Sequence, residues 1–336
     1  MSPMPPSLFL ALEKFPDSSE AHLWADYVEL RCLTDLDLMI AKSDIQAYVQ
    51  KRKDLQKGLG DYASDDDIES ERENGMYAED IKRAARAEDL FKHLEYRAAV
   101  FDNFYPFALS RDGDILRRRR RVTSKHKLYV FFLLCSNSRH IINRQHRNMF
   151  TDTFEIASMV ALKRYLPKGA EVHLFGTNSF NKGRYSGQLL KKCKCLATDL
   201  GERFVGKASE FPPNDYGDNG LDVVGWMPFG DNTKGFLLVF GQCACSGEEW
   251  PKKQHSSSAS HWRNAVTFTA PPCNMAFIPF FYRRNAGEWH MERKIDETVL
   301  IDRLRLVKLL RSSYKTLKEL PYGLINKAIS QRNSLI

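Results

Sequence analysis

The chain of 336 residues lacks any run of about 20 consecutive apolar residues, so we expect no membrane-spanning helix. Residues 1–6 lack a basic region followed by a long apolar core, and we therefore expect no signal peptide. The sequence has no Gly-x-x-x-x-Gly-Lys-Ser/Thr loop and no Gly-x-Gly-x-x-Gly segment. Membrane proteins and proteins with their own ATP or dinucleotide site are the classes that these absences argue against.

The seven cysteines are an odd number in a long chain, which argues against a disulfide framework. Free thiols are typical of the reducing cytoplasm, so a cytoplasmic location is predicted. Cys193 and Cys195 are separated by one residue, as are Cys243 and Cys245. Structural zinc sites usually leave two to four residues between paired cysteines, so these pairs, even with Cys273, are poor zinc candidates.

Basic residues outnumber acidic ones, which gives a net charge of +8 and a pI of about 9.0. Basic surfaces attract nucleic acid or anionic membranes, although a solvated basic surface has the same composition. The hydrophobic fraction of 43% is ample for a buried core. A globular protein with a basic surface is therefore expected.

The first part of the chain predicts a mostly helical N-terminal domain over residues 1–125. Residues 7–58 have helical periodicity, with a second helix expected over 43–59, and a further helix is expected over 78–100. Residues 61–75 are strongly acidic and almost free of apolar side chains, which predicts a mobile loop. Five arginines follow at 117–121, and they suit phosphate binding as well as a solvated helix end.

Residues 126–336 change to a mixed α/β pattern, after a buried helix expected over 128–135. Helices are predicted over 154–166 and 186–204. Strands are predicted over 172–175, 221–226, 235–243 and 276–282, and 298–312 begins as a strand and continues as a helix. The second and third of these strands flank a turn with Gly230, Asp231, Asn232 and Gly235, which is typical of a hairpin.

The hairpin would bring Asp222, at the start of one strand, beside Gln242, at the end of the next. This pattern resembles the PD-(D/E)xK nucleases, which include restriction endonucleases, Holliday-junction resolvases and many phage-defence nucleases. In that family a metal-binding Asp lies on one hairpin strand, and the next strand carries an acidic residue or Gln, a spacer and Lys. The resemblance implies a restriction-endonuclease-like core, in which helices flank a central mixed sheet.

The same resemblance implies a Mg²⁺- or Mn²⁺-dependent DNA endonuclease that acts against foreign DNA. Such a protein would work with a partner such as an ATPase or helicase; whether DNA or RNA is cut stays open. Phosphodiester cleavage needs a hard cation held by oxygen ligands, which activates water and neutralises the phosphate. Asp222 and Gln242 would contribute to that metal site.

In glutamine-variant members a Glu on a preceding helix completes the site, and Glu155 is the first candidate here. At helical spacing Glu155 shares a stripe with Met159, Leu162 and Leu166. The alternative is that the stripe only borders the core and leaves Glu155 in solvent. Glu202 is the second candidate, although its own helical stripe looks exposed.

The sequence departs from the family pattern at Ala244, which stands where the lysine is expected. Lys253, or less favourably Lys252, would replace that lysine if a helix near Trp250 turned back over the site. If neither lysine reaches the site, the chain would be a catalytically inactive nuclease-like module that binds nucleic acid or scaffolds a complex.

Overall fold

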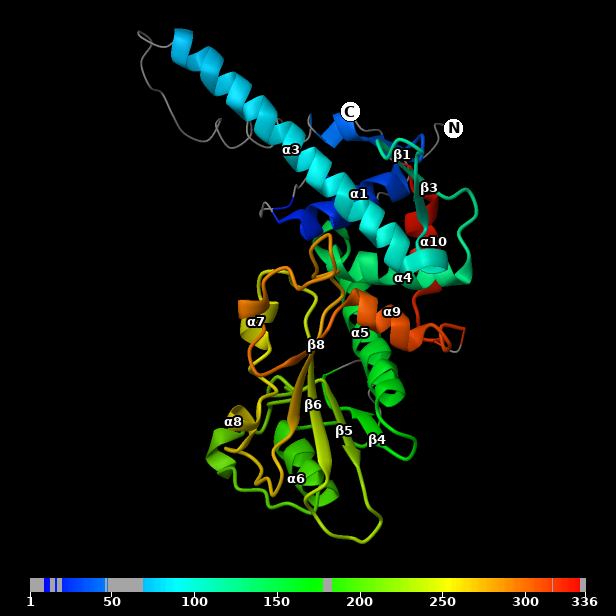
Figure 1. Cartoon of the computed structure of the whole chain (residues 1–336). Helices are drawn as coiled ribbons and strands as arrows, with labels where there is room; N and C mark the ends of the chain where they lie inside the picture. The colour runs from blue at the N-terminus through cyan, green and yellow to red at the C-terminus, as the bar shows by residue number, and fades with distance from the viewer. Residues whose placement is uncertain are drawn as a thin grey trace.

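The computed structural model describes residues 9–12, 16, 20–45, 47, 69–177, 183–315 and 317–332, with the side chains of 69–83 excepted. A helical region occupies one end of the molecule and a five-stranded sheet lies toward the other (Figure 1). The described α-helices are α1 (Ala21–Thr34), α3 (Glu69–Phe101), α4 (Ser124–Ser136), α5 (Arg144–Tyr165), α6 (Leu189–Asp199), α7 (Trp250–Lys253), α8 (Ala259–Trp262), α9 (Arg303–Leu310) and α10 (Tyr322–Ser330). The described strands are β1 (Met39–Ala41), β2 (Phe107–Leu109), β3 (Ile115–Arg118), β4 (Glu171–Leu174), β5 (Val223–Met227), β6 (Leu237–Cys243), β7 (Cys273–Phe277) and β8 (Val299–Ile301).

The large sheet has the strand order β4-β5-β6-β7-β8. Strands β4, β5 and β6 pair antiparallel, whereas β6, β7 and β8 pair parallel. A parallel pair needs a crossover connection, and the short helices α7 and α8 lie in the crossover from β6 to β7. The fold is therefore α/β with a mixed sheet, as the sequence predicted at that level.

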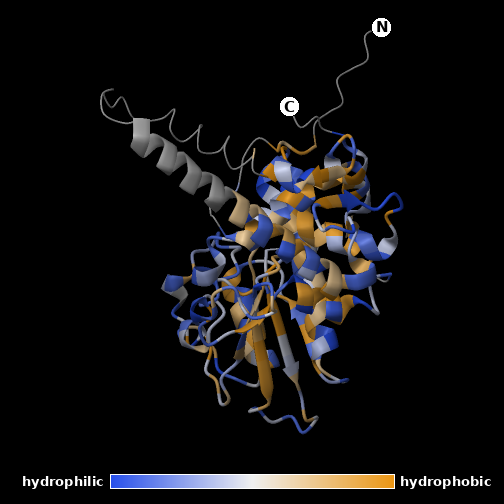
Figure 2. Cartoon of the chain, turned by 45° about the horizontal axis from the view of Figure 1, so that its top comes forward, coloured by the Kyte–Doolittle hydropathy of each residue, from blue (hydrophilic) through white to orange (hydrophobic). Residues whose placement is uncertain are grey.

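Side chains along the strands point alternately to the two faces of the large sheet, and a different helix packs on each face. Val223 and Val239 belong to one hydrophobic cluster with residues of α5. Val224 and Phe240, their neighbours in sequence, belong to a second cluster with residues of α6. Hydrophobic colour accordingly follows the sheet strands and gathers between the helices in Figure 2. Because both faces are covered, strands β5 to β8 are mostly buried, whereas the edge strand β4 is more exposed.

The predicted hairpin is confirmed, since β5 and β6 are antiparallel neighbours in a register that places Val223 opposite Gly241. The connection includes Gly230, Asn232 and Gly235 with φ values of 79°, 58° and 92°. Glycine adopts this left-handed region without steric cost, and asparagine tolerates it better than most residues. The turn chemistry read from the sequence therefore corresponds to the observed backbone.

The N-terminal region is helical but also contains a small sheet that was not predicted. The helical interpretation of residues 7–58 is wrong at Met39–Ala41, which form β1 and pair antiparallel with β3, as β2 also does. Residues 42–45 and 47 are helical, as the sequence predicted. Leu38, with φ of 59°, interrupts the helical geometry before β1. The arginine run is also not a helix end: Arg117 and Arg118 belong to β3, and Arg118 donates to the carbonyl of Ile329.

The observed bounds of several other elements differ from the predicted ones. Helix α3 begins at Glu69, so residues 69–75 are helical and not a loop; Glu and Arg favour helices despite their low hydropathy. The rest of the acidic segment, 61–68, and most of the helix expected over 43–59 lie outside the described residues. Helix α5 begins before the predicted residue 154 and is capped by Asn143. Helix α6 is shorter than the predicted 186–204, and β7 begins before the predicted residue 276. The strand-then-helix interpretation of 298–312 is confirmed by β8 and α9.

A network of buried charges joins the N-terminal helices to α9. Arg97 Nη1 lies 2.6 Å from Asp26 Oδ1 and 2.9 Å from Glu29 Oε2. Arg303 Nη2 lies 2.7 Å from Asp26 Oδ2, and the hydroxyl of Tyr129 donates to Glu29 Oε2 at 2.8 Å. We call these four charged residues the arginine network; its two positive and two negative charges balance.

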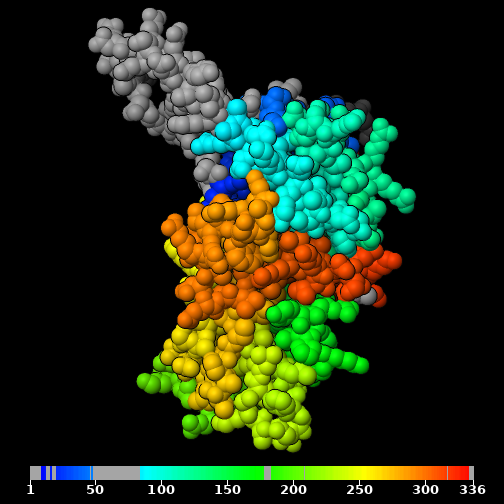
Figure 3. Space-filling view, in the orientation of Figure 1, coloured from blue at the N-terminus to red at the C-terminus, as the bar shows by residue number. Residues whose placement is uncertain are grey.

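One hydrophobic cluster also crosses the predicted boundary at residue 125, since it includes residues of α1, α3, α5 and α9. The space-filling view shows the orange to red-orange residues between the cyan N-terminal region and the green and yellow part of the chain that holds the large sheet (Figure 3). The division at 125 stays a prediction. In the part of the chain that the structure describes, every helix is too short or too polar to cross a membrane.

Candidate metal centre

Asp222 and Gln242 meet at the end of the β5–β6 hairpin. Gln242 Nε2 donates to Asp222 Oδ2 at 3.0 Å, and the Cys243 backbone N–H donates to the same oxygen at 2.6 Å. The Asp222 N–H donates to Gly241 O at 2.9 Å, which continues the ladder by one residue. Both side chains are buried, at 5% and 8% exposed. The two donors orient the carboxylate and leave Oδ1 on its other side.

Glu155 faces the same small space from α5. A Cβ atom built on Gly176 would lie 3.1 Å from Asp222 Oδ1 and 3.1 Å from Glu155 Oε2. Gly176 follows β4, and its N–H points to the Asp222 carbonyl at 3.3 Å. A side chain at position 176 would crowd both carboxylates, so glycine keeps open the space between them. Glu155 is therefore part of this arrangement and does not project into bulk solvent.

The pKa of Asp222 is raised from 3.8 to about 7, mainly by burial and also by the nearby Asp218 carboxylate. The Cys243 N–H, Gln242 and Lys253 lower this pKa but do not overcome burial. Both donors in contact with Oδ2 are neutral, so they stabilise the carboxylate less than a contacting cation would. The Glu155 carboxylate borders the same space, so a cation bound there would interact favourably with both acids.

Lys253 lies in α7 and lines a cavity of about 560 Å³ together with Glu155 and Cys243. Its ammonium lies 2.9 Å from the Glu249 carboxylate, and its side chain is 45% exposed. The cavity also reaches Leu23 of α1 and Arg139 after α4, so it opens between the helical region and the sheet. Lys252 is exposed and does not line this cavity.

A second lysine near the site was missed by the sequence reasoning. Lys192 is 2% exposed, and its ammonium donates to Phe175 O at 3.2 Å. Burial lowers the pKa of Lys192, while Asp218, Asp215 and Asp222 raise it, which places its charge within electrostatic reach of Asp222. Its position at i+3 from Leu189, inside the apolar stripe of α6, was the available signal.

Two other predicted positions lie away from this centre. Glu202 follows α6, where its carboxylate accepts from the Thr269 N–H and the Thr267 hydroxyl; its side chain is 5% exposed, so the expected exposure was wrong. Ala244 is buried in a cluster with Trp250, and its N–H donates to Phe277 O. Position 244 therefore offers no cation, which leaves that role to Lys253 or Lys192.

The donor set suits a hard divalent cation: two carboxylates, a side-chain amide and an open space between the acids. Hard cations prefer oxygen ligands, and their charge would offset the burial of both acids. Comparison of the chain with protein families, with curated proteins and with solved structures found no match. The site chemistry therefore rests on the geometry of this chain.

Proposed function

We propose that the chain is a Mg²⁺- or Mn²⁺-dependent nuclease of the restriction-endonuclease-like type, with DNA as its substrate. The observation that carries the proposal is the meeting of Asp222 Oδ1 and Glu155 Oε2 around the space that Gly176 leaves open. The order of elements supports it as well. A helix with Glu155 precedes a hairpin with Asp222 on one strand and Gln242 on the next, as the glutamine variant of the family requires.

In this proposal Asp222 and Glu155 hold the cation, and Gln242 orients Asp222 through its 3.0 Å hydrogen bond. A bound cation would supply charge neutralisation at the phosphate and activation of water. Lys253 lies on the cavity wall, where its ammonium can stabilise charge that develops on the phosphate. Action against foreign DNA, with an ATPase or helicase as partner, belongs to the same proposal and rests on the family resemblance.

The test is cleavage of supercoiled plasmid with Mg²⁺, with Mn²⁺ and with chelator. We expect nicking that requires the metal, persists in Asp231→Asn and falls at least ~10³-fold in Asp222→Asn and Glu155→Gln. Asp231 is a matched control because it lies in the loop at the opposite end of the same hairpin. Equal nicking in Asp222→Asn and in the unmodified protein would contradict the proposal.

A catalytically inactive nucleic-acid-binding module is the second candidate, and Ala244 is the observation that favours it. Intact plasmid under every condition, together with metal-independent DNA binding in a gel-shift assay, would support this candidate. Binding without cleavage should then survive Asp222→Asn, because phosphate contacts from basic side chains need no cation at Asp222.

A further inference from the structure

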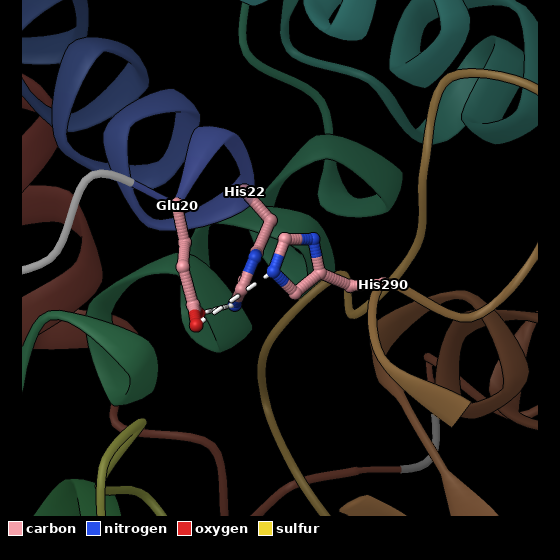
Figure 4. Close-up of side chains that lie close together, drawn as sticks. All are labelled: Glu20, His22 and His290. Carbon is pink, nitrogen blue, oxygen red and sulfur yellow. Dashed lines mark ion pairs between the residues drawn. The ribbon is translucent and has the colours of Figure 1, made fainter. Parts of the chain in front are cut away.

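Three metal-ligating side chains meet where the start of α1 faces the segment between β7 and β8 (Figure 4). Glu20 is the N-cap residue of α1 and His22 lies in the first turn, while His290 comes from the other segment. One ligand atom from each residue lies within 4.8 Å of the other two. The trio shares no residue with the centre at Asp222, and no part of the proposed nuclease reaction uses it.

The distances in the trio are close to those of a metal site. His22 Nε2 lies 3.5 Å from one Glu20 carboxylate oxygen, and His290 Nε2 lies 3.7 Å from the other. Metal–ligand bonds of about 2.0–2.2 Å in a tetrahedral site separate neighbouring ligand atoms by roughly 3.3–3.6 Å. The three groups therefore need only small side-chain rotations to share one ion.

Neither imidazole has all of its hydrogen-bonding capacity used by the protein. His22 is only 2% exposed. His22 Nδ1 is buried and makes no hydrogen bond to the residues that the structure describes, and His290 Nε2 is buried with the Glu20 carboxylate, at 3.7 Å, as its ion-pair partner. The two ring nitrogens of His22 exchange places when the ring turns over, so either can face Glu20. A buried polar atom without a partner costs free energy, and a bound ion would remove that cost.

The surroundings of His22 and Glu20 favour the protonation states in which these two side chains bind metals. Burial, with His290 next in importance, holds the pKa of His22 well below its usual value, so this imidazole is neutral. His290, with smaller contributions from His22 and Lys294, lowers the pKa of Glu20 to about 2 against the opposing effect of burial. The Tyr282 ring packs against both imidazoles, at centroid distances of 5.2 and 5.5 Å, and limits their movement.

We propose that Glu20, His22 and His290 form a second metal site, which takes a transition-metal dication such as Zn²⁺. Two imidazoles and one carboxylate suit Zn²⁺ or Co²⁺ better than Mg²⁺, which prefers oxygen ligands throughout. Three protein ligands leave a fourth position for water or for a ligand. The ion would tie α1 to the segment between β7 and β8.

The Lys294 ammonium would compete with a metal ion for the Glu20 carboxylate. This ammonium lies 3.3 Å from Glu20 and the Lys294 side chain is 38% exposed, so it can move into solvent when an ion binds. Removing its positive charge should therefore strengthen metal binding, whereas a purely structural ion pair would be lost without that gain. This opposite effect separates a metal site from a hydrogen-bonded cluster.

The test is a titration of the chelator-treated full chain with Zn²⁺ and with Co²⁺. We expect one ion per chain at this site and a rise in Tm of roughly 5 °C at a hundredfold excess over Kd. Glu20→Gln and His290→Ala should weaken binding at least tenfold and remove the rise in Tm. Lys294→Ala should bind several-fold more tightly. Bound Co²⁺ should show ligand-field bands without thiolate charge-transfer bands.

His255→Ala and Asp222→Asn are the matched controls. His255 is an exposed histidine 4.0 Å from Asp296, so its loss should leave Zn²⁺ binding unchanged. Binding that persists in Asp222→Asn separates this site from the candidate nuclease centre. Unchanged Zn²⁺ affinity in both Glu20→Gln and His290→Ala, or a cobalt spectrum dominated by thiolate bands, would overturn the proposal.

Discussion

Asp26 and Asp222 are both buried aspartates, at 2% and 5% exposed, but different groups surround their carboxylates. Asp26 contacts Arg97 and Arg303, whereas the donors in contact with Asp222 Oδ2 are the amide of Gln242 and the N–H of Cys243. At both carboxylates burial makes the largest single contribution to the pKa, and this contribution is upward. At Asp26 the two arginines outweigh burial and lower the pKa, whereas at Asp222 the pKa stays raised, at about 7.

This difference separates a cluster of charges that compensate one another from the candidate metal centre. The arginine network carries its own counter-charges, although burial still raises the pKa of Glu29. The centre at Asp222 places a second acid beside the first, while Lys253 stands on the rim of the cavity. A buried acid that contacts only neutral donors is destabilised when ionised, and a cation from solution would reverse this. Burial alone thus does not mark a candidate metal ligand; the absence of a contacting cation is what distinguishes Asp222 from Asp26.

The largest effect is expected from breaking the arginine network. Arg303→Met should lower the free energy of unfolding by about 3–5 kcal/mol, because Asp26 and Glu29 would share one arginine. Chemical denaturation measures this change. Arg263→Met is the control at an exposed arginine and should change stability by less than about 0.5 kcal/mol. A loss below about 1 kcal/mol in Arg303→Met would show that the network is weaker than its geometry suggests.

Replacing the cation at the cavity rim should affect rate and not stability. Lys253→Ala is expected to slow metal-dependent cleavage roughly 10²-fold, because an ammonium that stabilises developing charge is lost. Single-turnover cleavage measures this rate. Lys252→Ala is the matched control on the same short helix and should cleave normally. If Lys253→Ala also cleaves normally, Lys192 becomes the lysine to test.

Neutralising Asp222 should stabilise the metal-free protein, whereas removing a charge from the arginine network should destabilise it. A raised pKa means that the folded protein favours protonated Asp222; the penalty is absent below pH about 4 and grows until pH about 7. Asp222→Asn should therefore raise the free energy of unfolding at pH 8 by on the order of 2 kcal/mol.

The gain in Asp222→Asn should disappear at pH 4, where the native carboxyl is protonated, and denaturant titrations at both pH values measure it. The same titration predicts that at limiting Mg²⁺ cleavage falls about tenfold for each pH unit below 7. Asp222→Asn that is less stable than the unmodified protein at pH 8 would contradict the electrostatic account of this site.

A methyl group in the space between the acids should weaken metal binding with little effect on folding. Gly176→Ala would place Cβ 3.1 Å from both carboxylate oxygens, so one of them must move by a few tenths of an ångström. We expect about tenfold weaker Mg²⁺ or Mn²⁺ binding, measured by titration. Gly323→Ala is the control, because a Cβ there meets nothing within 4 Å. Unchanged affinity in Gly176→Ala would place the ion elsewhere.

Local patterns were enough to predict the hairpin and the meeting of Asp222 with Gln242. Turn residues and alternating hydrophobicity act over a few positions, and an antiparallel pair then fixes which residues are opposite. The helical stripe similarly placed Glu155 on the inner side of α5. Lys253 was favoured over Lys252 from the expected helix near Trp250, and Lys253 lines the cavity.

Contacts between distant segments were not visible in the sequence. The arginine network joins Asp26 to Arg303, which are 277 positions apart, and the trio at Glu20 needs His290 from another segment. These contacts form only when the helical region packs on the sheet, and the periodicity of hydrophobic residues within one segment does not predict that packing. Gly176 was missed for the same reason, because its role follows from two carboxylates that reach it from α5 and from the hairpin.

The most direct test of the candidate metal centre at Asp222 is Mn²⁺ binding, measured through the electron paramagnetic resonance signal of the free ion. The measurement should use His290→Ala as the background, so that the trio at Glu20 does not contribute. If Asp222 and Glu155 hold the cation, this protein binds Mn²⁺ and the added Asp222→Asn change removes the binding. Equal Mn²⁺ binding with and without Asp222→Asn would contradict a metal centre at the end of the hairpin.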